Sequence, residues 1–452
     1  PMLPERLSNE LCSLRPGEDR LAKVVWVDVG ESGEILDATI EKAVIRSAQR
    51  FTYKQVQTIL DAGKDPDKIT TDAIVEMLKE LTDVRSLLRD RRLAAGCLDL
   101  DLDEMRLTLD DEGEVIAVEA RERLDAHNLV EECMLIANEA VASIATERGI
   151  AILRRVHAPP IQEDLDRFAR LCRVLAPEAT VRGIDDLPAV IDAVRGSAAA
   201  PVVSFALLKT LSRAEYSPLR EPHFALRKDE YCHFTSPIRR YPDLQVHRAI
   251  DRHIFDGVDP RTDAATASLL EMAETCSTRE RTAEAAERDM ARLRAISWLR
   301  HRVGERFTGV VTSVRNQGFH VRLDGVLIDG FVHVSKLNDD TYIFNETQFA
   351  LRGVHAGNMI RLGDPVEVEL EAVDPLHRDI DLRYLHTRPG ARRGRGSGAN
   401  PGKRVSKRRP DQGRKEPSQR RSRKRSNGEG SRARPATGKR RGRPGKGTRR
   451  TR

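Results

Sequence analysis

The sequence predicts an α+β body, then a small all-β barrel, then a basic tail. Residues 1–255 mix alternating apolar patterns, typical of strands, with longer helical patterns. Residues 303–386 change to short alternating segments with glycines at the bends, which indicates a β-barrel. From residue 387 onward the chain is rich in Arg, Lys, Gly, Pro and Ser and has few apolar residues. Such a segment cannot bury enough apolar surface to fold, so we expect residues 387–452 to be disordered.

Within the body, strand patterns come early and helical patterns follow. Alternation predicts strands at Ala22–Val29, Glu34–Ile45, Leu98–Asp103 and Glu114–Glu119. Helical periodicity predicts helices at Ala126–Arg148, Ile161–Leu175 and Pro188–Arg195. Residues 256–302 are expected to connect the body to the barrel, and residues 262–302 have the pattern of one charged helix that ends near Trp298.

Cysteine usage and hydropathy exclude two classes of protein. The six cysteines are scattered without a C-x-x-C pair, which argues against a zinc ribbon and against a disulfide framework. We expect buried thiols in a reducing cytosol, and therefore a cytoplasmic protein. No apolar run reaches the ~18 residues that span a bilayer, the nearest being Ala198–Leu208, so no membrane partner is expected.

The net positive charge of the chain is concentrated in its tail, and the rest of the chain is acidic. Residues 386–452 contain 26 Lys and Arg and three acidic residues, a net charge of +23. The whole chain carries +7, so residues 1–385 carry −16. A basic run of this density favours contact with nucleic-acid phosphates, through the release of counterions, over a segment that is only solvated.

The barrel region predicts a five-stranded fold that binds single strands. Its alternating segments are Phe307–Val314, Gly318–Leu323, Leu327–His333 and Val366–Val373. Gly318-Phe-His-Val-Arg-Leu323 and Gly330-Phe-Val-His-Val-Ser335 resemble an S1-type OB-fold, which stacks bases on exposed aromatic rings. The resemblance implies an RNA face of Phe319, Phe331 and His333 with Arg322 nearby. The alternative is that Phe319 or Phe331 belongs to the barrel core, and His320 replaces an aromatic residue often found at its position.

The strongest functional signal is residues 231–248, Tyr-Cys-His-Phe-Thr-Ser-Pro-Ile-Arg-Arg-Tyr-Pro-Asp-Leu-Gln-Val-His-Arg. Pro237 follows Ser236, and proline is favoured in the first turn of a helix, where its missing N–H is not needed. Arg239 is then expected in the first helical turn, beside the dipole end that favours a phosphate. For S-P-x-R-R taken alone, an amphipathic helix with solvated arginines is the alternative. The full string resembles the signature of the ribonuclease II/ribonuclease R (RNB) family of processive 3′-to-5′ exoribonucleases.

The resemblance runs almost continuously to about Leu385 and assigns a function to the whole chain. It implies a partial RNB catalytic domain followed by the S1-type barrel, and the basic tail favours the ribonuclease R branch. The implied reaction is hydrolysis of single-stranded RNA to nucleoside 5′-monophosphates, with Mg²⁺ as cofactor. The family's metal-binding aspartates, D-x5-D-x-D-D, lie upstream of the segment with which this chain starts. We therefore expect a C-terminal fragment that has no metal ligands and is inactive alone.

Several residues match functional positions of the family. Arg239 matches the arginine that contacts the phosphate at the cleavage position, where a planar, always-charged donor can hold two oxygens. Tyr53, Glu131 and Glu287 match a tyrosine near the terminal nucleotides, an active-site glutamate and a glutamate that lines the RNA path. For both glutamates the alternative is a surface carboxylate paired at i,i+4. Arg240 is expected to line the RNA path, with an ion pair to a neighbouring acid as the alternative.

The aspartates within this chain do not replace the missing cluster. Asp99, Asp101 and Asp103 alternate with leucines and would share one face of a strand. Their spacing fails the EF-hand pattern, because the glycine at its position 6 is absent. The segment resembles a non-catalytic hairpin of the family, so we expect a solvated strand face.

Two charged features near the signature have other interpretations. Residues 224–232 are more charged than the family's linker at this place, and Arg227 and Lys228 either contact phosphate or lie in an exposed loop. His247 follows Asp243 by four residues, the spacing of an intrahelical ion pair.

A second class of function also agrees with the sequence: a non-catalytic RNA-binding protein that keeps the RNA channel, the barrel and the tail. In either case the expected partner is single-stranded or structured RNA. The tail is also available to the ribosome or to RNA-decay factors.

Deleting residues 388–452 should weaken RNA binding and flatten its dependence on salt. Each phosphate that the tail neutralises contributes about 0.7 to the slope of log affinity against log salt for a single strand. Titrations of labelled RNA at several salt concentrations measure both quantities. Unchanged affinity and unchanged slope would show that the tail does not contact RNA.

Overall fold

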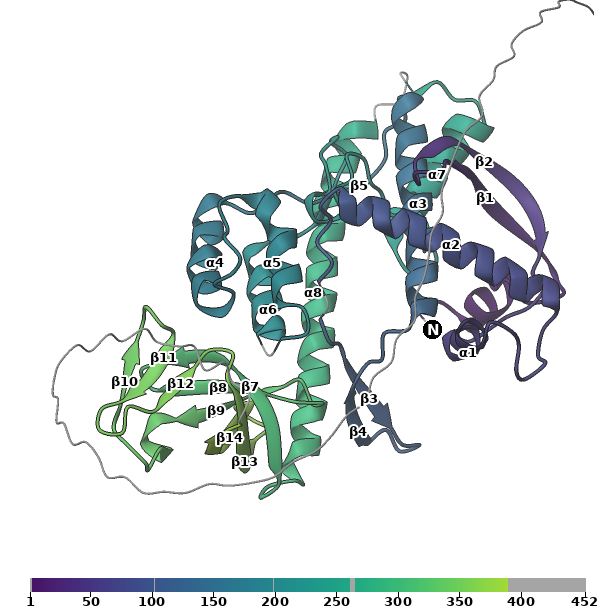
Figure 1. Cartoon of the computed structure of the whole chain (residues 1–452). Coiled ribbons are helices and arrows are strands. Elements are labelled where there is room, and N and C mark those ends of the chain that lie inside the picture. The colour runs from purple at the N-terminus through teal and green to yellow at the C-terminus, as the bar shows by residue number, and fades with distance from the viewer. Residues whose placement is uncertain (1, 101, 198, 261–264, 389–452) are drawn as a thin grey trace, which may run out of the picture. The chain divides into compact units, whose positions relative to one another are not determined.

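A computed structural model describes residues 2–388 apart from Asp101, Ala198 and residues 261–264 (Figure 1). Asp101 and the predicted basic tail from residue 389 onward therefore lie outside the described residues, and Thr387, predicted as the first residue of the tail, is the last residue of a strand. No helix among the described residues is long and apolar enough to cross a membrane. All six cysteines are free thiols.

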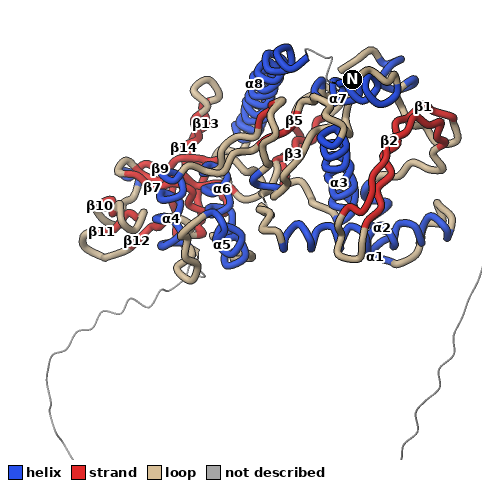
Figure 2. The backbone as a smooth tube through the Cα atoms, turned by 90° about the horizontal axis from the view of Figure 1, so that it is seen from above, coloured by secondary structure: helices blue, strands red, loops and turns tan. Residues whose placement is uncertain are grey.

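The first part of the chain begins with a long antiparallel hairpin. Strand β1 (Asp19–Val29) pairs with β2 (Ile35–Arg46), a ribbon that Figure 2 shows in red. A short π-helix (Arg6–Leu11) precedes the hairpin, and helices α1 (Tyr53–Ala62) and α2 (Asp72–Ala94) follow it. Both strands were predicted within a few residues, whereas neither α1 nor α2 was predicted.

A second hairpin leads into the central helix. Strands β3 (Met105–Leu109) and β4 (Val115–Ala120) pair with each other, and α3 (Asp125–Glu147) follows. The prediction of a strand at Leu98–Asp103 is wrong, because the described residues there adopt no regular structure and β3 starts at Met105. Asp99 is not on a solvated face either: its side chain is 12% exposed and pairs with Arg89.

Helices make up most of the remaining body. The elements are β5 (Arg154–Val156), α4 (Gln162–Leu175), the 3₁₀ turn Ile184–Asp186, α5 (Leu187–Val194), α6 (Ala200–Thr210), β6 (Glu215–Ser217), the 3₁₀ turn Phe224–Leu226, α7 (Tyr241–Ile250), the π-turn Asp251–Phe255 and α8 (Ala265–Arg300). Short strands β5 and β6 pair antiparallel. The predicted helices at α3, α4, α5 and α8 are present with nearly the predicted bounds.

One core joins α3, α7 and the first hairpin. Val141 and Ala142 of α3 are fully buried and belong to one cluster with Val246 and Ile250 of α7 and with Ile40 of β2. Each large aliphatic side chain buried in this way stabilises the fold by about 1.5–3 kcal/mol. This cluster fixes α7, which contains the second part of the signature segment, against α3.

The predicted five-stranded barrel is confirmed. Strands β7 (Arg306–Arg315), β8 (Gly318–Leu323), β9 (Asp329–His333), β13 (Pro365–Asp374) and β14 (Asp379–Thr387) close in the order β13-β14-β9-β8-β7. A 3₁₀ turn (Val334–Lys336) follows β9. An unpredicted three-stranded sheet, β10 (Tyr342–Asn345), β11 (Ala350–Gly353) and β12 (Met359–Arg361), is inserted between β9 and β13.

Substitution of Gly318 by alanine should destabilise the barrel. Gly318 has φ +148°, and a Cβ there would overlap the carbonyl oxygen of Val332 and lie 2.9 Å from the ring of Phe331. The backbone strain alone costs about 1–3 kcal/mol. Gly325→Ala is the matched control, because Gly325 also has a positive φ, +75°, but open space around it. Urea unfolding measures the free energy of unfolding of both variants. Equal losses of stability would show that the contacts of the new Cβ with Val332 and Phe331 cost nothing beyond the backbone strain.

Candidate active site

The signature segment forms a turn before its helix starts. The backbone N–H groups of Arg239 and Arg240 donate to the carbonyl of Ser236, at 3.2 and 3.0 Å. Helix α7 begins at Tyr241 and has Pro242 in its first turn. The prediction that Ser236-Pro237 starts the helix is therefore wrong, and Arg239 lies in the preceding turn, where its side chain is exposed. Pro237 and Pro242 are each suited to the first turn of a helix. The helix starts beside Pro242, because Asp243 binds Ser236 and Arg240 and holds the residues around Pro237 in a separate turn.

Asp243 fixes this turn from inside the protein. Its side chain is 0% exposed, and Oδ1 accepts hydrogen bonds from the Ser236 N–H and from Nη2 of Arg240, both at 2.8 Å. Arg240 was predicted to line the RNA path, with an ion pair to a neighbouring acid as the alternative interpretation. The structure has that ion pair, with Asp243. His247 does not pair with Asp243 as predicted: its Nε2 contacts the Phe234 carbonyl at 2.9 Å, and the two rings stack. Arg239 is left as the exposed cation of the turn.

Helix α3 holds the start of the signature segment. Asn138 is 3% exposed; its Oδ1 accepts the N–H of Phe234 at 2.9 Å and its Nδ2 donates to the Tyr231 hydroxyl at 3.0 Å. Glu131 lies seven residues earlier, so it projects from the same side of α3 about 10 Å along the axis.

A pocket lies at the N-terminal end of α3. It has a volume of about 570 Å³ and is lined by Leu100, Leu102, Glu104, Arg121, Glu122, Arg123, His127 and Glu131. Glu131 Oε2 is 3.5 Å from Nη2 of Arg123. Tyr53, the first residue of α1, lays its ring on that of His127, with centroids 4.2 Å apart. The structure therefore brings the predicted Tyr53 and Glu131 together through His127, which sequence reasoning missed.

Glu287 does not join this group. It is exposed on α8 and does not line the pocket. Another glutamate of α8 contacts the signature region instead: Glu280 pairs with Arg155 at 2.6 Å and lies 3.4 Å from the Tyr216 hydroxyl.

Buried histidines surround the signature segment. The Tyr216 hydroxyl is 3.0 Å from Nδ1 of His233, and the rings of His157 and His223 lie 5.0 Å apart. Burial lowers the pKa of His223 to about 3, with a smaller contribution from His157. Burial, followed by the charges of Arg240 and Arg155, lowers the pKa of His233 to about 2. The pKa of His157 is lowered chiefly by burial as well. All three imidazoles are therefore neutral at pH 7.

In the barrel, Phe319 is not on the predicted RNA face. Its ring is 0% exposed and lies edge-on to Tyr384. Successive side chains of a strand point to opposite faces, so Phe319 and Arg322 cannot share one. The core alternative holds for Phe319, and the prediction that it faces RNA is wrong.

The outer face of β8 and β9 carries a different aromatic group. The half-buried ring of Phe331 lies 4.9 Å from that of His320 and 6.1 Å from that of His333. Arg322 is on the same face, but it pairs with Asp329 at 2.8 and 3.1 Å, and its guanidinium lies 4.6 Å from the ring of Phe205. Arg322 therefore already has two protein partners.

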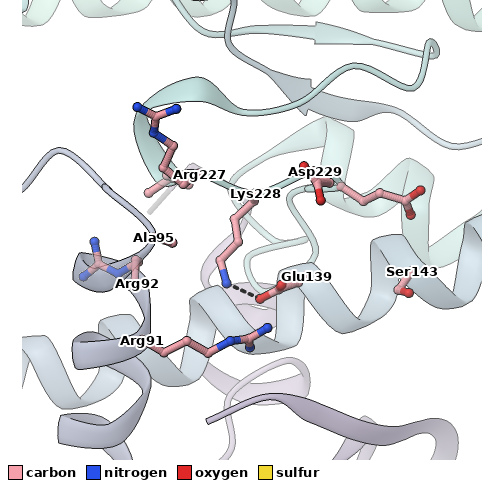
Figure 3. A pocket seen from close by; sticks show the side chains of 10 residues that line it. Arg91, Arg92, Ala95, Glu139, Ser143, Arg227, Lys228 and Asp229 are labelled. Carbon is pink, nitrogen blue, oxygen red and sulfur yellow. Dashed lines mark hydrogen bonds and ion pairs between the residues drawn. The ribbon is translucent and has the colours of Figure 1, made fainter. Parts of the chain in front are cut away.

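The charged loop before the signature is tied to helices. Figure 3 shows Lys228 reaching Glu139 of α3, one wall of a pocket of about 260 Å³ that Arg91, Arg92 and Arg227 also line. Arg227 pairs with Asp185 at 3.0 Å. Since Arg227 and Lys228 both have acidic partners, they anchor the loop rather than extend freely into solvent.

The described residues do not fit a magnesium site. Among them, no group of three or more His, Cys, Asp or Glu side chains is placed to hold a metal ion. Asp99 is paired with arginine, and Asp101 lies outside the described part of the chain.

Two family models match the chain, and ribonucleases R of several bacteria are similar to it in sequence. A family model for the "RNB domain" matches residues 1–256, and one for the "S1 RNA binding domain" matches residues 300–384. Ribonuclease R of Aquifex aeolicus is 36% identical over 388 residues, which cover 85% of this chain and 55% of the relative. Ribonuclease R of Escherichia coli is 35% identical over 396 residues, which cover 85% of this chain and 49% of the relative.

A solved structure agrees in fold. Mycoplasma genitalium RNase R, in complex with ribose-methylated single-stranded RNA, matches with a TM-score of 0.77 and 27% identity, over 85% of this chain and 61% of that one. The chain spans about half the length of the curated relatives that it matches.

Replacing Asp243 with asparagine should destabilise the protein by about 3 kcal/mol. The amide can still accept the Ser236 N–H, but it leaves the largely buried Arg240 guanidinium without its counter-charge. Glu163→Gln is the matched control, because its pair with Arg167 is 63–80% exposed and should contribute almost nothing. Urea unfolding of the two variants compares them. If Asp243→Asn lowered the free energy of unfolding no more than the control does, the buried ion pair between Asp243 and Arg240 would not stabilise the fold.

Acidification should destabilise the fold well above the pH at which carboxylates titrate. The three histidines have folded pKa values below the unfolded value of 6.5, so unfolding takes up protons as pH falls below it. His223 and His233, with folded pKa values of about 3 and about 2, then each remove about 1.4 kcal/mol of unfolding free energy per pH unit, and His157 acts in the same direction. Urea unfolding at pH 7.5, 6.5 and 5.5 measures the slope, and His233→Gln should reduce it. A flat profile would mean that these imidazoles titrate normally in the folded protein.

Proposed function

The chain belongs to the RNB family, and on that premise we propose that it is part of a processive 3′-to-5′ exoribonuclease. The substrate is single-stranded RNA and the products are nucleoside 5′-monophosphates. One observation carries the proposal: α3 carries His127 and Glu131 in the wall of a pocket, with Tyr53 of α1 against His127, and it anchors the segment of the Arg239 turn further along the same side. A place for a terminal nucleotide and a cation for its phosphate are thus positioned by one helix.

Each residue of this arrangement has a role in the proposal. Tyr53 is 45% exposed and offers its ring to a base, as aromatic residues do in single-strand-binding proteins. Arg239 binds the phosphate at the cleaved bond and stabilises the negative charge that develops on its oxygens. Glu131 contacts the terminal nucleotide from the pocket wall, and Glu287 lines the path of the strand along α8.

The barrel supplies a second contact with the same strand. Phe331, flanked by His320 and His333, offers aromatic surface for stacking, which tolerates any base sequence. The Mycoplasma genitalium relative is seen with ribose-methylated single-stranded RNA, which supports RNA as the ligand. The basic tail adds phosphate contacts and raises the local concentration of RNA.

The metal ions are assigned to carboxylates beyond the described residues. We place the family's aspartate cluster, D-x5-D-x-D-D, in sequence upstream of Pro1. Reading the coding sequence there tests this directly. An in-frame cluster supports the nuclease. A start codon directly before Pro1 favours the second candidate, a non-catalytic RNA binder.

Substitution of Arg239 by alanine should reduce turnover by about 10²–10³-fold and RNA affinity far less, because its guanidinium acts on charge that appears in the transition state. Single-turnover RNA degradation, in protein that carries the aspartate cluster, and RNA titration measure the two effects. Arg170→Ala, an exposed arginine of α4, is the control and should change neither. Equal losses of turnover and affinity would assign Arg239 to ground-state binding only.

A further inference from the structure

His233 lies in the signature segment, six residues before Arg239, and its ring is held on several sides. The rings of Tyr216 and Tyr231 both stand edge-on to the imidazole, with centroids 5.7 and 5.9 Å away. The Tyr216 hydroxyl is 3.0 Å from Nδ1. Tyr231 is itself fixed, because Asn138 of α3 donates to its hydroxyl at 3.0 Å. These contacts hold the imidazole in one orientation.

The proton of the neutral imidazole lies on Nε2. The Tyr216 hydroxyl has two acceptors in range, Nδ1 of His233 at 3.0 Å and Oε1 of Glu280 at 3.4 Å. Because 3.4 Å is long for an O–H···O bond, the hydroxyl donates to Nδ1, and the ring's own proton is on Nε2. Nε2 has no hydrogen-bond partner in the part of the chain that the structure describes, and it reaches solvent. His233 thus presents one oriented N–H donor.

The charges around this donor favour an anion. Glu280 is paired with Arg155 at 2.6 Å. Asp243 is paired with Arg240 at 2.8 Å. Arg239 is exposed and has no acidic partner among the described residues. One uncompensated positive charge therefore remains, and a phosphate oxygen, which is negative and accepts hydrogen bonds, suits both this charge and a neutral N–H donor.

Arg239 is close enough to His233 to act on it electrostatically. The turn that carries Arg239 is closed by the carbonyl of Ser236, three residues after His233. Burial is the main cause that lowers the pKa of His233, and the charge of Arg239 is among the further causes, after Arg240 and others. Coulomb interactions weaken with distance and are screened by salt, so this effect requires the two side chains to be near each other. The guanidinium and the Nε2–H donor thus belong to one electropositive site.

We propose that His233 is a second phosphate-binding residue of this site: its Nε2–H donates to a non-bridging oxygen of the phosphate that Arg239 contacts. The inference rests on the proposed function, which supplies an RNA strand as the ligand. A neutral donor binds the phosphate before the reaction starts, whereas the guanidinium responds to charge that develops during it. His233 therefore contributes chiefly to RNA affinity, and Arg239 chiefly to turnover.

The test uses short single-stranded RNAs in which one phosphodiester is replaced by a methylphosphonate, which is neutral and lacks one non-bridging oxygen. The replaced linkage is moved one position at a time from the 3′ end, and its two stereoisomers are compared. The full 452-residue chain is titrated with each RNA by fluorescence anisotropy. The unmodified chain should lose about tenfold in affinity at one linkage, where the charged acceptor is removed.

Variants then separate the donor from the ring. His233→Phe keeps a ring between Tyr216 and Tyr231 but loses Nε2–H, so the loss at that linkage should shrink to about twofold. This change should appear for the one stereoisomer that lacks the oxygen bound by His233. His233→Gln keeps an N–H donor and should retain most of the loss, and Tyr216→Phe, which leaves Nδ1 without its donor, should retain part of it. His301→Phe, exposed just beyond α8, is the control and should change nothing.

The outcomes separate the inference from the proposed function. Each loss compares two ligands in one protein preparation, so a partly unfolded variant does not distort it. An effect of His233→Phe on one stereoisomer, at the linkage that Arg239→Ala also affects, supports the inference. An unchanged loss, an equal change for both stereoisomers, or an effect at another linkage overturns it and leaves the proposed function intact. Failure of every RNA to bind would instead overturn the proposed function.

Discussion

The buried carboxylate of Asp243 determines where the signature turn lies. A fully buried charge is tolerated only when it is paired, and Asp243 satisfies Oδ1 with one backbone N–H and one guanidinium of the same turn. Arg240 is drawn inward by this pair, and Arg239, its neighbour, is left exposed. Two adjacent arginines that look equivalent in sequence therefore have opposite tasks, one structural and one open to a ligand.

Helix α3 extends that constraint to the pocket. Its buried Asn138 binds the segment before the turn, its small residues pack against α7, and its first turns carry His127 and Glu131. A single rigid helix thus sets the spacing between the phosphate-binding cation and the terminal-nucleotide pocket. The histidines around the signature are neutral, so they add no positive charge beside Arg239.

Sequence reasoning found the architecture because strand alternation and helical periodicity are local, as β1, β2, α3 and the barrel show. It misjudged features that depend on tertiary contacts. Asp99 seemed a strand residue, but its arginine partner lies on α2; His127 had no signal, because Tyr53 is far away in sequence. The error at Phe319 was avoidable: its parity on β8 differs from that of Arg322, and His320 has the outward parity.

In the proposed function one site, built on α3, holds the RNA terminus between the His127–Glu131 pocket and Arg239. A crystal structure of this chain with a short single-stranded RNA tests this arrangement. We expect the terminal ribose in the pocket, its base on the Tyr53 ring and an adjacent phosphate on the Arg239 guanidinium. RNA bound only on the barrel, or a 3′ end lying away from α3, would contradict it.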